Sequence, residues 1–236
     1  GAERLRDMPF RPWRACVDNP ALCEVVPEED GDRVRTELVL SKAAPEAAAQ
    51  RAVHVLLVQR PRRQGRWIAN LPELTRWVER LRHPGARIAL LVADFEQLHP
   101  AAQWQLAAQA HILIGVTGAA LAWTAFLPRG GVVLDVFPPG SRFCTEGWGR
   151  NAASHFGGLA RLGGQQHTCT QHPAATLGPP QDGENEVQHA AREVRQLLGG
   201  FWHGQSVRVD MGKFAGVFRE AVDRVLTAVF NDAAPR

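Results

Sequence analysis

Two short stretches of this sequence combine residue types that bind anions. Residues 60–70 (RPRRQGRWIAN) contain Arg60 and Arg66 and directly follow a short apolar run. Residues 112–120 (ILIGVTGAA) end a second apolar run in Gly-Val-Thr-Gly. A planar guanidinium group pairs with two phosphate oxygens at once, and the N–H groups at a helix N-terminus attract negative charge. Together the two stretches predict a phosphate or nucleotide site.

The small residues of the second stretch have two interpretations. At Gly118 and Ala119 they would let a phosphate approach the backbone at the start of a helix. Thr117 would then cap that helix or give its hydroxyl to a phosphate. The same residues are also typical of close packing between a helix and a sheet, and the sequence leaves both interpretations open.

Regularly alternating elements have to position these two stretches. Apolar runs predict strands at 53–58, 88–93, 111–116 and 132–137, and helical periodicity predicts helices at 71–81, 101–110 and 118–127. This alternation predicts an α/β fold with a parallel, Rossmann-like sheet and helices on both faces. The carboxyl ends of parallel strands meet at one edge, so both anion-favouring stretches would face one crevice.

The remaining segments are less regular. We expect residues 1–51 to be an irregular arm or the remnant of a preceding domain, with a weak strand at 33–40, and residues 52–236 to form the Rossmann-like domain. Later elements are expected as helices at 151–162, 186–198 and 212–230 and as short strands at 165–170 and 206–209.

Composition is typical of a globular domain. The 236 residues are 45% apolar and 22% charged, with a net charge of +3. No apolar run approaches the roughly 18 residues of a membrane helix, so we expect no membrane span in this chain, with any anchor lying upstream. Only Lys42 and Lys213 are lysines among the 27 basic residues, and nine arginines fall within 51–87. They form a solvated face or an anion site; without interleaved aromatic residues they do not indicate nucleic-acid binding.

The four cysteines lack the spacing of a metal site, and we expect none. We favour two disulfides, each closing a loop, which would place the protein in an oxidising compartment; four free thiols in a cytosolic protein are the alternative. The pairs would be Cys16–Cys23 and Cys144–Cys169. The histidines do not cluster, and His167 and His172 are expected at the surface.

Two segments resemble glycosyltransferase family 61. VLLVQRPRRQGRWIANLPEL is similar to the opening of that family's catalytic half, with matches at Arg60, Arg66, Ile68, Asn70, Glu73 and Leu74. AAQWQLAAQAHILIGVTGAALAWTAFLPRGGVVLDVFP resembles a later glycine-containing stretch, with matches at Gln103, Ile112, Leu113, Gly115, Gly118, Ala119, Leu121, Phe126, Leu127, Pro128 and Pro138. The resemblance covers about 53–230.

The chain departs from the family pattern at several positions. Thr117 stands where the family has His, Ala120 replaces its second Gly, and Trp123 replaces its Asn. Asp135 replaces a Glu, and His111 an acidic residue. A threonine still donates one hydrogen bond but cannot carry the charge of a histidine.

The resemblance implies the donor-binding C-terminal half of a GT-B glycosyltransferase, acting with inversion and without a metal. The donor would be a UDP-linked sugar, with no other cofactor, and the acceptor a hydroxyl group on a glycan or glycoprotein. It also implies the secretory pathway, in the Golgi or endoplasmic reticulum lumen, and an acceptor-binding half that lies upstream or in a partner chain.

The expected donor-binding residues are Arg60, Arg66, Asn70, Thr117, Gly118, Ala119 and Asp135. Asp135 would meet ribose or sugar hydroxyls, or would cap a turn. The general base is unassigned, because Asp94 and Glu96 equally suit a loop or a helix cap. Two alternatives remain: a catalytically inactive relative serving as a structural or partner-binding module, and an unrelated α/β nucleotide-binding enzyme with another strand order.

Overall fold

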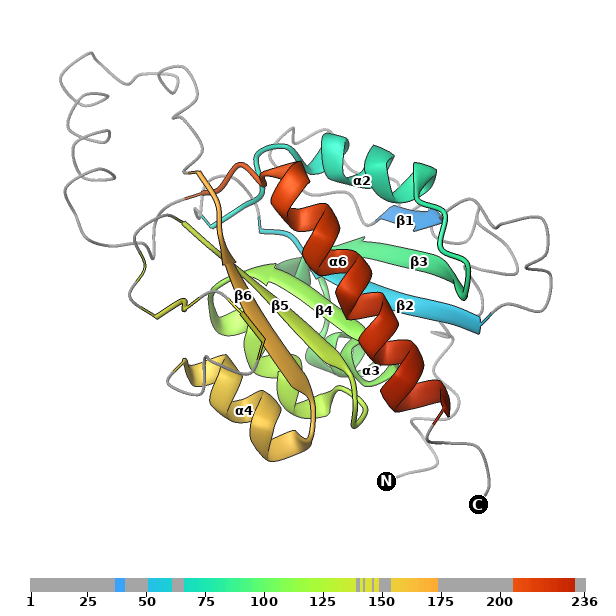
Figure 1. The fold of residues 1–236 in the computed structure, drawn as a ribbon. Helices are drawn as coiled ribbons and strands as arrows, with labels where there is room; N and C mark the ends of the chain where they lie inside the picture. The colour runs from blue at the N-terminus through green and yellow to red at the C-terminus, as the bar shows by residue number, and fades with distance from the viewer. Residues whose placement is uncertain are drawn as a thin grey trace, which may run out of the picture.

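The computed structural model describes residues 37–40, 51–60, 66–138, 141, 143–145, 147–148, 154–173 and 206–231 (Figure 1). The helix expected at 186–198 and the Cys16–Cys23 pair lie outside these residues. None of the helices in the described part of the chain has the length and apolar character needed to span a membrane.

The described strands form one sheet. They are β1 (Glu37–Leu40), β2 (Arg51–Val58), β3 (Ala86–Ala93), β4 (Ile112–Val116), β5 (Val132–Phe137) and β6 (Gln166–Gln171), arranged in the order β1-β3-β2-β4-β5-β6. Strands β2 to β6 are parallel. The predicted α/β fold is therefore confirmed. Strand β1 lies within the expected arm, yet it adds an antiparallel edge strand to this sheet.

The strand order reverses next to β2. The chain passes from β2 outward to β3, returns across β2 to β4, and then continues to β5 and β6. Val58 at the end of β2 is level with Ala93 of β3 and with Gly115 of β4. The connections that leave β2 and β4 therefore diverge at this edge, which is where open α/β sheets form their ligand crevices.

Helices cover both faces of the sheet, as predicted (Figure 1). On one face lie α2 (Leu71–Arg80) and α6 (Met211–Val225), the latter continued by a π-helical segment (Leu226–Asn231). On the other lie α3 (Pro100–Gln109), α4 (His155–Gly163) and the 3₁₀ helix η5 (Ala119–Phe126). A short 3₁₀ turn, η4 (Phe95–Gln97), links β3 to α3.

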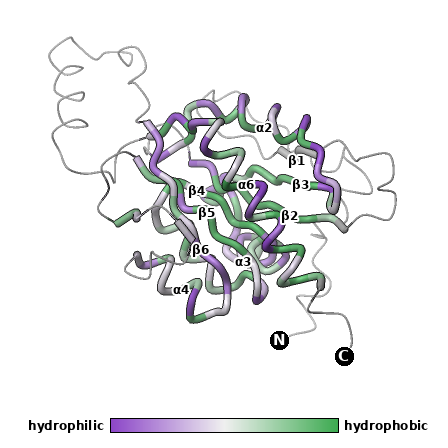
Figure 2. Tube along the Cα trace, in the orientation of Figure 1, coloured by the Kyte–Doolittle hydropathy of each residue, from purple (hydrophilic) through white to green (hydrophobic). Residues whose placement is uncertain are grey.

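Strands β2 to β5 are largely apolar on both faces because both faces are covered (Figure 2). In β2, Val55 and Leu57 pack toward α2 and α6, whereas Leu56 and Val58 pack toward α3 and η5. All four side chains are at most 4% exposed. This two-sided burial explains why the run has no alternation with polar residues.

Two elements differ from the sequence prediction. The helix after β4 is 3₁₀ rather than α: the N–H of Leu121 donates to the carbonyl of Gly118 and that of Leu127 to Thr124, three residues back. The Thr124 hydroxyl also donates to the Leu121 carbonyl at 2.6 Å, which favours this tighter winding. Residues 206–209 do not form the expected strand. Val207 alone among them forms an isolated parallel bridge, with Ile68.

A disulfide fastens the segment after β5 to the edge of the sheet. It joins Cys144 to Cys169 of β6, the pairing expected from the sequence, with Cα atoms 5.7 Å apart. Both cysteines are buried against Phe137 at the end of β5. The carboxamide of Gln171 donates to the carbonyls of Ser141 and Cys144, so this segment is also held by hydrogen bonds.

Candidate functional site

The side chain of Gln59 links the two ends of the segment between Gln59 and Ile68, which contains Arg60 and Arg66. Gln59, the residue after β2, is 4% exposed. Its Nε2 donates to the carbonyl of Ile68 at 3.2 Å, and the N–H of Ile68 donates to its Oε1 at 3.1 Å. This carboxamide imitates a neighbouring peptide group, so the loop that begins at Arg60 is closed at its base, as in an Ω-loop.

Asn70 anchors the same loop at its far end. Its Nδ2 donates to the carbonyl of Val209 at 2.9 Å, and the N–H of Val209 donates to its Oδ1 at 2.8 Å. The second amide hydrogen goes to Glu73. Asn70 was expected among the donor-binding residues, but these bonds occupy its buried carboxamide. The structure gives it a positioning role at the start of α2.

Arg66 packs directly on the backbone of the turn after β4. Its φ is 55°, a left-handed conformation that is uncommon for residues other than glycine. A Cβ placed on Gly118 would lie 2.6 Å from Nη1 of Arg66, so the guanidinium group occupies space that a larger residue at 118 would take, and such a residue would displace it. Gly115 serves the other predicted purpose, close packing, because a Cβ there would lie 3.1 Å from Leu121.

Two positive charges therefore meet at this edge. Burial and, secondarily, the neighbouring charge of Arg60 lower the pKa of Arg66. Within the part of the chain that the structure describes, the buried Nη1 of Arg60 and Nε of Arg66 have no hydrogen-bond partner. Like charges with unpartnered donors favour an anion between them, because it offsets the repulsion and accepts the free hydrogen bonds.

A pocket of about 270 Å³ opens beside Arg60. It lies over the carboxyl ends of β2 and β3 and is bounded by α3 and the first turn of η5. Arg60 lines one side, and Ala119 and Ala120 line another. The N–H groups of that first turn have no partners of their own inside the helix and give it a partial positive charge. Arg60 and Ala119, both predicted site residues, are thus brought together.

The rest of the pocket wall is aromatic and acidic. Trp123 of η5 meets Phe95 edge to face, with ring centroids 6.2 Å apart. Asp94 and Glu96 lie in the wall. Asp94 caps η4, since its carboxylate accepts from the N–H of Glu96 at 3.0 Å and from Nε2 of Gln97 at 3.1 Å. Of the two interpretations left open for Asp94, the structure shows the cap.

Asp135 lies on β5, beside β6. Its carboxyl group is fully buried and faces His167 of β6, with Oδ2 3.4 Å from Nε2. The Thr117 hydroxyl also bonds to Asp135 and does not cap η5. Asp135 therefore lies behind Thr117 and the turn after β4, and its expected contact with ligand hydroxyls stays a prediction.

Burial dominates the electrostatics of Asp135. It raises the pKa of the carboxyl group to about 6, against the opposing effects of the hydrogen bond and charge of His167 and of the Thr117 hydroxyl. Oδ1 of Asp135 and Nδ1 of His167 have no partner among the described residues. The pair is thus an ionisable group held inside the protein directly behind the site.

Sequence reasoning misplaced two histidines and missed one glutamine. His167 and His172, expected at the surface, are 5% and 1% exposed. The signal for His167 was its position in a strand beside Asp135, which becomes visible only once β5 and β6 are known to pair. The signal for Gln59 was a polar residue at the end of an otherwise apolar strand. Among the described residues, no group of three or more His, Cys, Asp or Glu could hold a metal ion.

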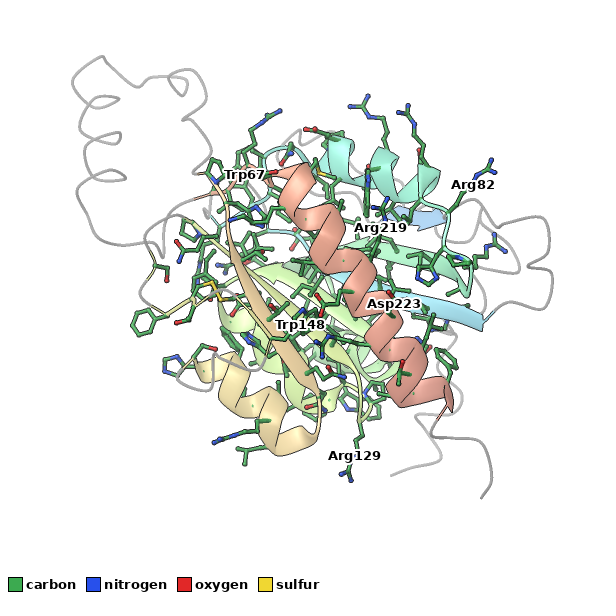
Figure 3. The ribbon with its side chains drawn as sticks, viewed as in Figure 1. Trp67, Arg82, Arg129, Trp148, Arg219 and Asp223 are labelled. Carbon is green, nitrogen blue, oxygen red and sulfur yellow. A yellow bond between two sulfur atoms is a disulfide. The ribbon has the colours of Figure 1, made fainter. Side chains whose placement is uncertain are left out.

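Figure 3 shows how the site lies within the molecule: Trp67, in the loop after Arg66, sits beside the start of α6, whereas Arg129 projects from the opposite end. The N–H of Val207 donates to the Trp67 carbonyl, which fixes the loop at that place.

Comparison with known proteins finds one family. A family model described as Glycosyltransferase 61 matches residues 16–134. The match includes both anion-favouring stretches and begins within the expected arm. No curated protein matches the chain significantly.

Replacing Gln59 tests the closure of the loop. Gln59→Leu leaves the buried N–H and carbonyl of Ile68 unpartnered, at about 1–3 kcal/mol each, and frees Arg66. We expect the free energy of unfolding to fall by about 2–4 kcal/mol, and pyrophosphate to bind more weakly in calorimetric titration. Gln109→Leu, at the exposed end of α3, is the matched control and should change neither quantity. Wild-type pyrophosphate affinity in Gln59→Leu would show that the clamp does not position the arginines.

Replacing Asp135 tests its buried ionisation. Because the pKa is raised in the folded protein, ionisation opposes folding: the cost is absent below pH 4, grows between pH 4 and 6, and is constant above. The free energy of unfolding of Asp135→Asn minus that of the wild type should therefore rise by on the order of 2–3 kcal/mol across this range. Urea unfolding of both proteins from pH 3.5 to 7.5 measures it. A difference that stays flat with pH would contradict the assignment.

Proposed function

The chain belongs to glycosyltransferase family 61, and from that membership we propose that it binds a nucleotide-diphosphate sugar, UDP-linked, and transfers the sugar to a hydroxyl group. The observation that supports the donor site is the packing of Arg66 against Gly118 with Arg60 nearby. Among the described residues, Nη1 of Arg60 and Nε of Arg66 have no hydrogen-bond partner. A diphosphate carries negative charge and acceptor oxygens, which complement the positive charge and the N–H donors of these arginines.

The proposed mechanism is electrostatic. As the bond between the sugar and the diphosphate breaks, negative charge develops on the leaving group. Arg60, Arg66 and the N–H groups that begin η5 would stabilise this charge without a metal, in a site arranged before the reaction starts. The acceptor hydroxyl would attack from the opposite side of the sugar, which inverts the anomeric carbon, and a general base would take its proton.

The acceptor and the compartment are also proposals. We place the acceptor hydroxyl on a glycan or glycoprotein, bound by a second domain of the same protein or of a partner chain. The Cys144–Cys169 disulfide supports a place in the secretory pathway, where the lumen is oxidising.

Calorimetric titration with UDP tests the donor site. Arg66→Ala removes a charge-assisted pair of hydrogen bonds, so we expect a ten- to hundredfold loss of affinity, of the order that such bonds contribute. Arg66→Lys should recover only part of it, because an ammonium group lacks the planar fork. Arg129→Ala, at the opposite end of the molecule (Figure 3), is the control and should bind like the wild type. The donor site is refuted if millimolar UDP and other nucleotides produce no binding heat with the wild-type protein.

The departures from the family pattern favour a second candidate, a non-catalytic module that retains donor binding. Thr117 replaces the family's His, and its hydroxyl is engaged with Asp135. The two candidates are separated by an assay of sugar transfer and donor hydrolysis over the common UDP-sugars. A module gives no product from any donor, and Thr117→His does not create it, whereas an enzyme turns over at least one donor.

A further inference from the structure

Resting on the donor site proposed above, we propose that the pocket beside Arg60 is a saccharide subsite, in which Trp123 is the platform for a sugar ring and Glu96 accepts hydrogen bonds from its hydroxyl groups. The pocket and its lining are the observations that support it. This assigns a role to Trp123, which stands where the family pattern has Asn.

The size of the pocket suits one ring. At about 270 Å³ it lies below the roughly 300–1,000 Å³ of sites that enclose a drug-sized ligand. A complete nucleotide sugar would not fit inside it. The pocket shares Arg60 and the first turn of η5 with the anion site, so a ring bound there is continuous with a diphosphate held by the arginines.

The aromatic wall is fixed in place. Trp123 meets Phe95 at an interplanar angle of 84° and contacts Phe126 on its own helix, with ring centroids 5.4 Å apart. It is half-buried and packs against the core beneath α3 and η5. An indole held in this way presents apolar area at little cost in conformational entropy, which suits the apolar face of a sugar ring.

The polar groups that line the pocket favour a sugar over a nucleobase as its ligand. The carboxamides of Gln59 and Gln103 are bonded to backbone carbonyls of Ile68, Phe95 and Leu98, and Asp94 caps η4. Glu96 is the exposed acid of the wall. An ionised carboxylate only accepts hydrogen bonds. A sugar ring offers several hydroxyl donors to such a group, whereas a uracil ring offers one N–H donor, flanked by two carbonyl oxygens that the carboxylate repels.

The test compares UDP with UDP-sugars in calorimetric titrations of the wild type and of Trp123→Ala. We use UDP-glucose, UDP-N-acetylglucosamine, UDP-xylose and UDP-arabinose. At least one should bind the wild type more tightly than UDP does. In Trp123→Ala we expect its affinity to fall about five- to tenfold, with UDP affinity unchanged within twofold. Trp123→Phe should keep part of the sugar-dependent gain, because it retains an aromatic face.

Two further variants make the result specific. Trp104→Ala removes an exposed tryptophan of α3 outside the pocket lining and should leave every affinity unchanged. Glu96→Gln should reduce the gain from the sugar while leaving UDP binding equal or slightly tighter, because it removes a negative charge near the diphosphate. A merely structural role for Glu96 would lower the affinities for UDP and for the UDP-sugar together.

The outcomes are distinguishable from failure of the donor site itself. Equal losses of UDP and UDP-sugar affinity in Trp123→Ala would assign the pocket to the nucleotide and overturn the proposal, as would an undiminished sugar gain. If the wild type binds no nucleotide, saturation-transfer NMR with the corresponding methyl glycosides decides. A signal that disappears in Trp123→Ala supports the subsite, and the absence of any signal, or one that persists in the variant, refutes it.

Discussion

The contact between the Arg66 guanidinium group and the backbone of Gly118 joins the two halves of the candidate site. It brings a positive charge from the loop after β2 against the turn after β4, and the guanidinium group occupies space that a Cβ at residue 118 would take. Neither half alone is unusual: small residues after a parallel strand and arginines on a loop both occur for reasons of packing or solubility. Their contact, with Arg60 close enough to lower the pKa of Arg66, creates a local excess of positive charge.

The sheet makes this contact possible through its strand order. Because β3 lies on one side of β2 and β4 on the other, the connections leaving β2 and β4 diverge and open a crevice. The loop would not stay at this crevice by itself. Gln59 and Asn70 close its two ends with side-chain amides that imitate peptide groups, and Arg66 accepts a left-handed backbone there. The site thus depends on buried amides that touch no ligand.

Periodicity in the sequence predicted what local patterns determine. Two-sided apolar runs identified β2 to β5, and the sequence predicted a helix at 212–230, which the structure forms as α6 and its π-helical continuation. The 3₁₀ form of η5 could not be predicted, because the apolar composition of this stretch does not distinguish 3₁₀ from α winding. Likewise, nothing in the spacing showed that β6 pairs with β5, and this pairing buries His167 beside Asp135. The contact between Arg66 and Gly118 follows from strand topology together with the Gln59 and Asn70 bonds that hold the loop. That these residues bind the donor stays a prediction.

The exchange of the family's His for Thr117 has an electrostatic consequence for the site. Thr117 is neutral, and the carboxyl group of Asp135 behind it has a pKa raised to about 6, so its charge grows as the pH rises toward neutrality. A bound diphosphate is opposed by that carboxylate and favoured by its protonated form. Among the described residues, the formal positive charge at this edge therefore comes from Arg60 and Arg66, supplemented by the partial charge of the η5 N-terminus. The left-handed backbone of Arg66, the mutual repulsion of the two arginines and their donors without a partner among the described residues are costs of the unliganded protein. A bound anion offsets these costs, and this links ligand affinity directly to the stability of the fold.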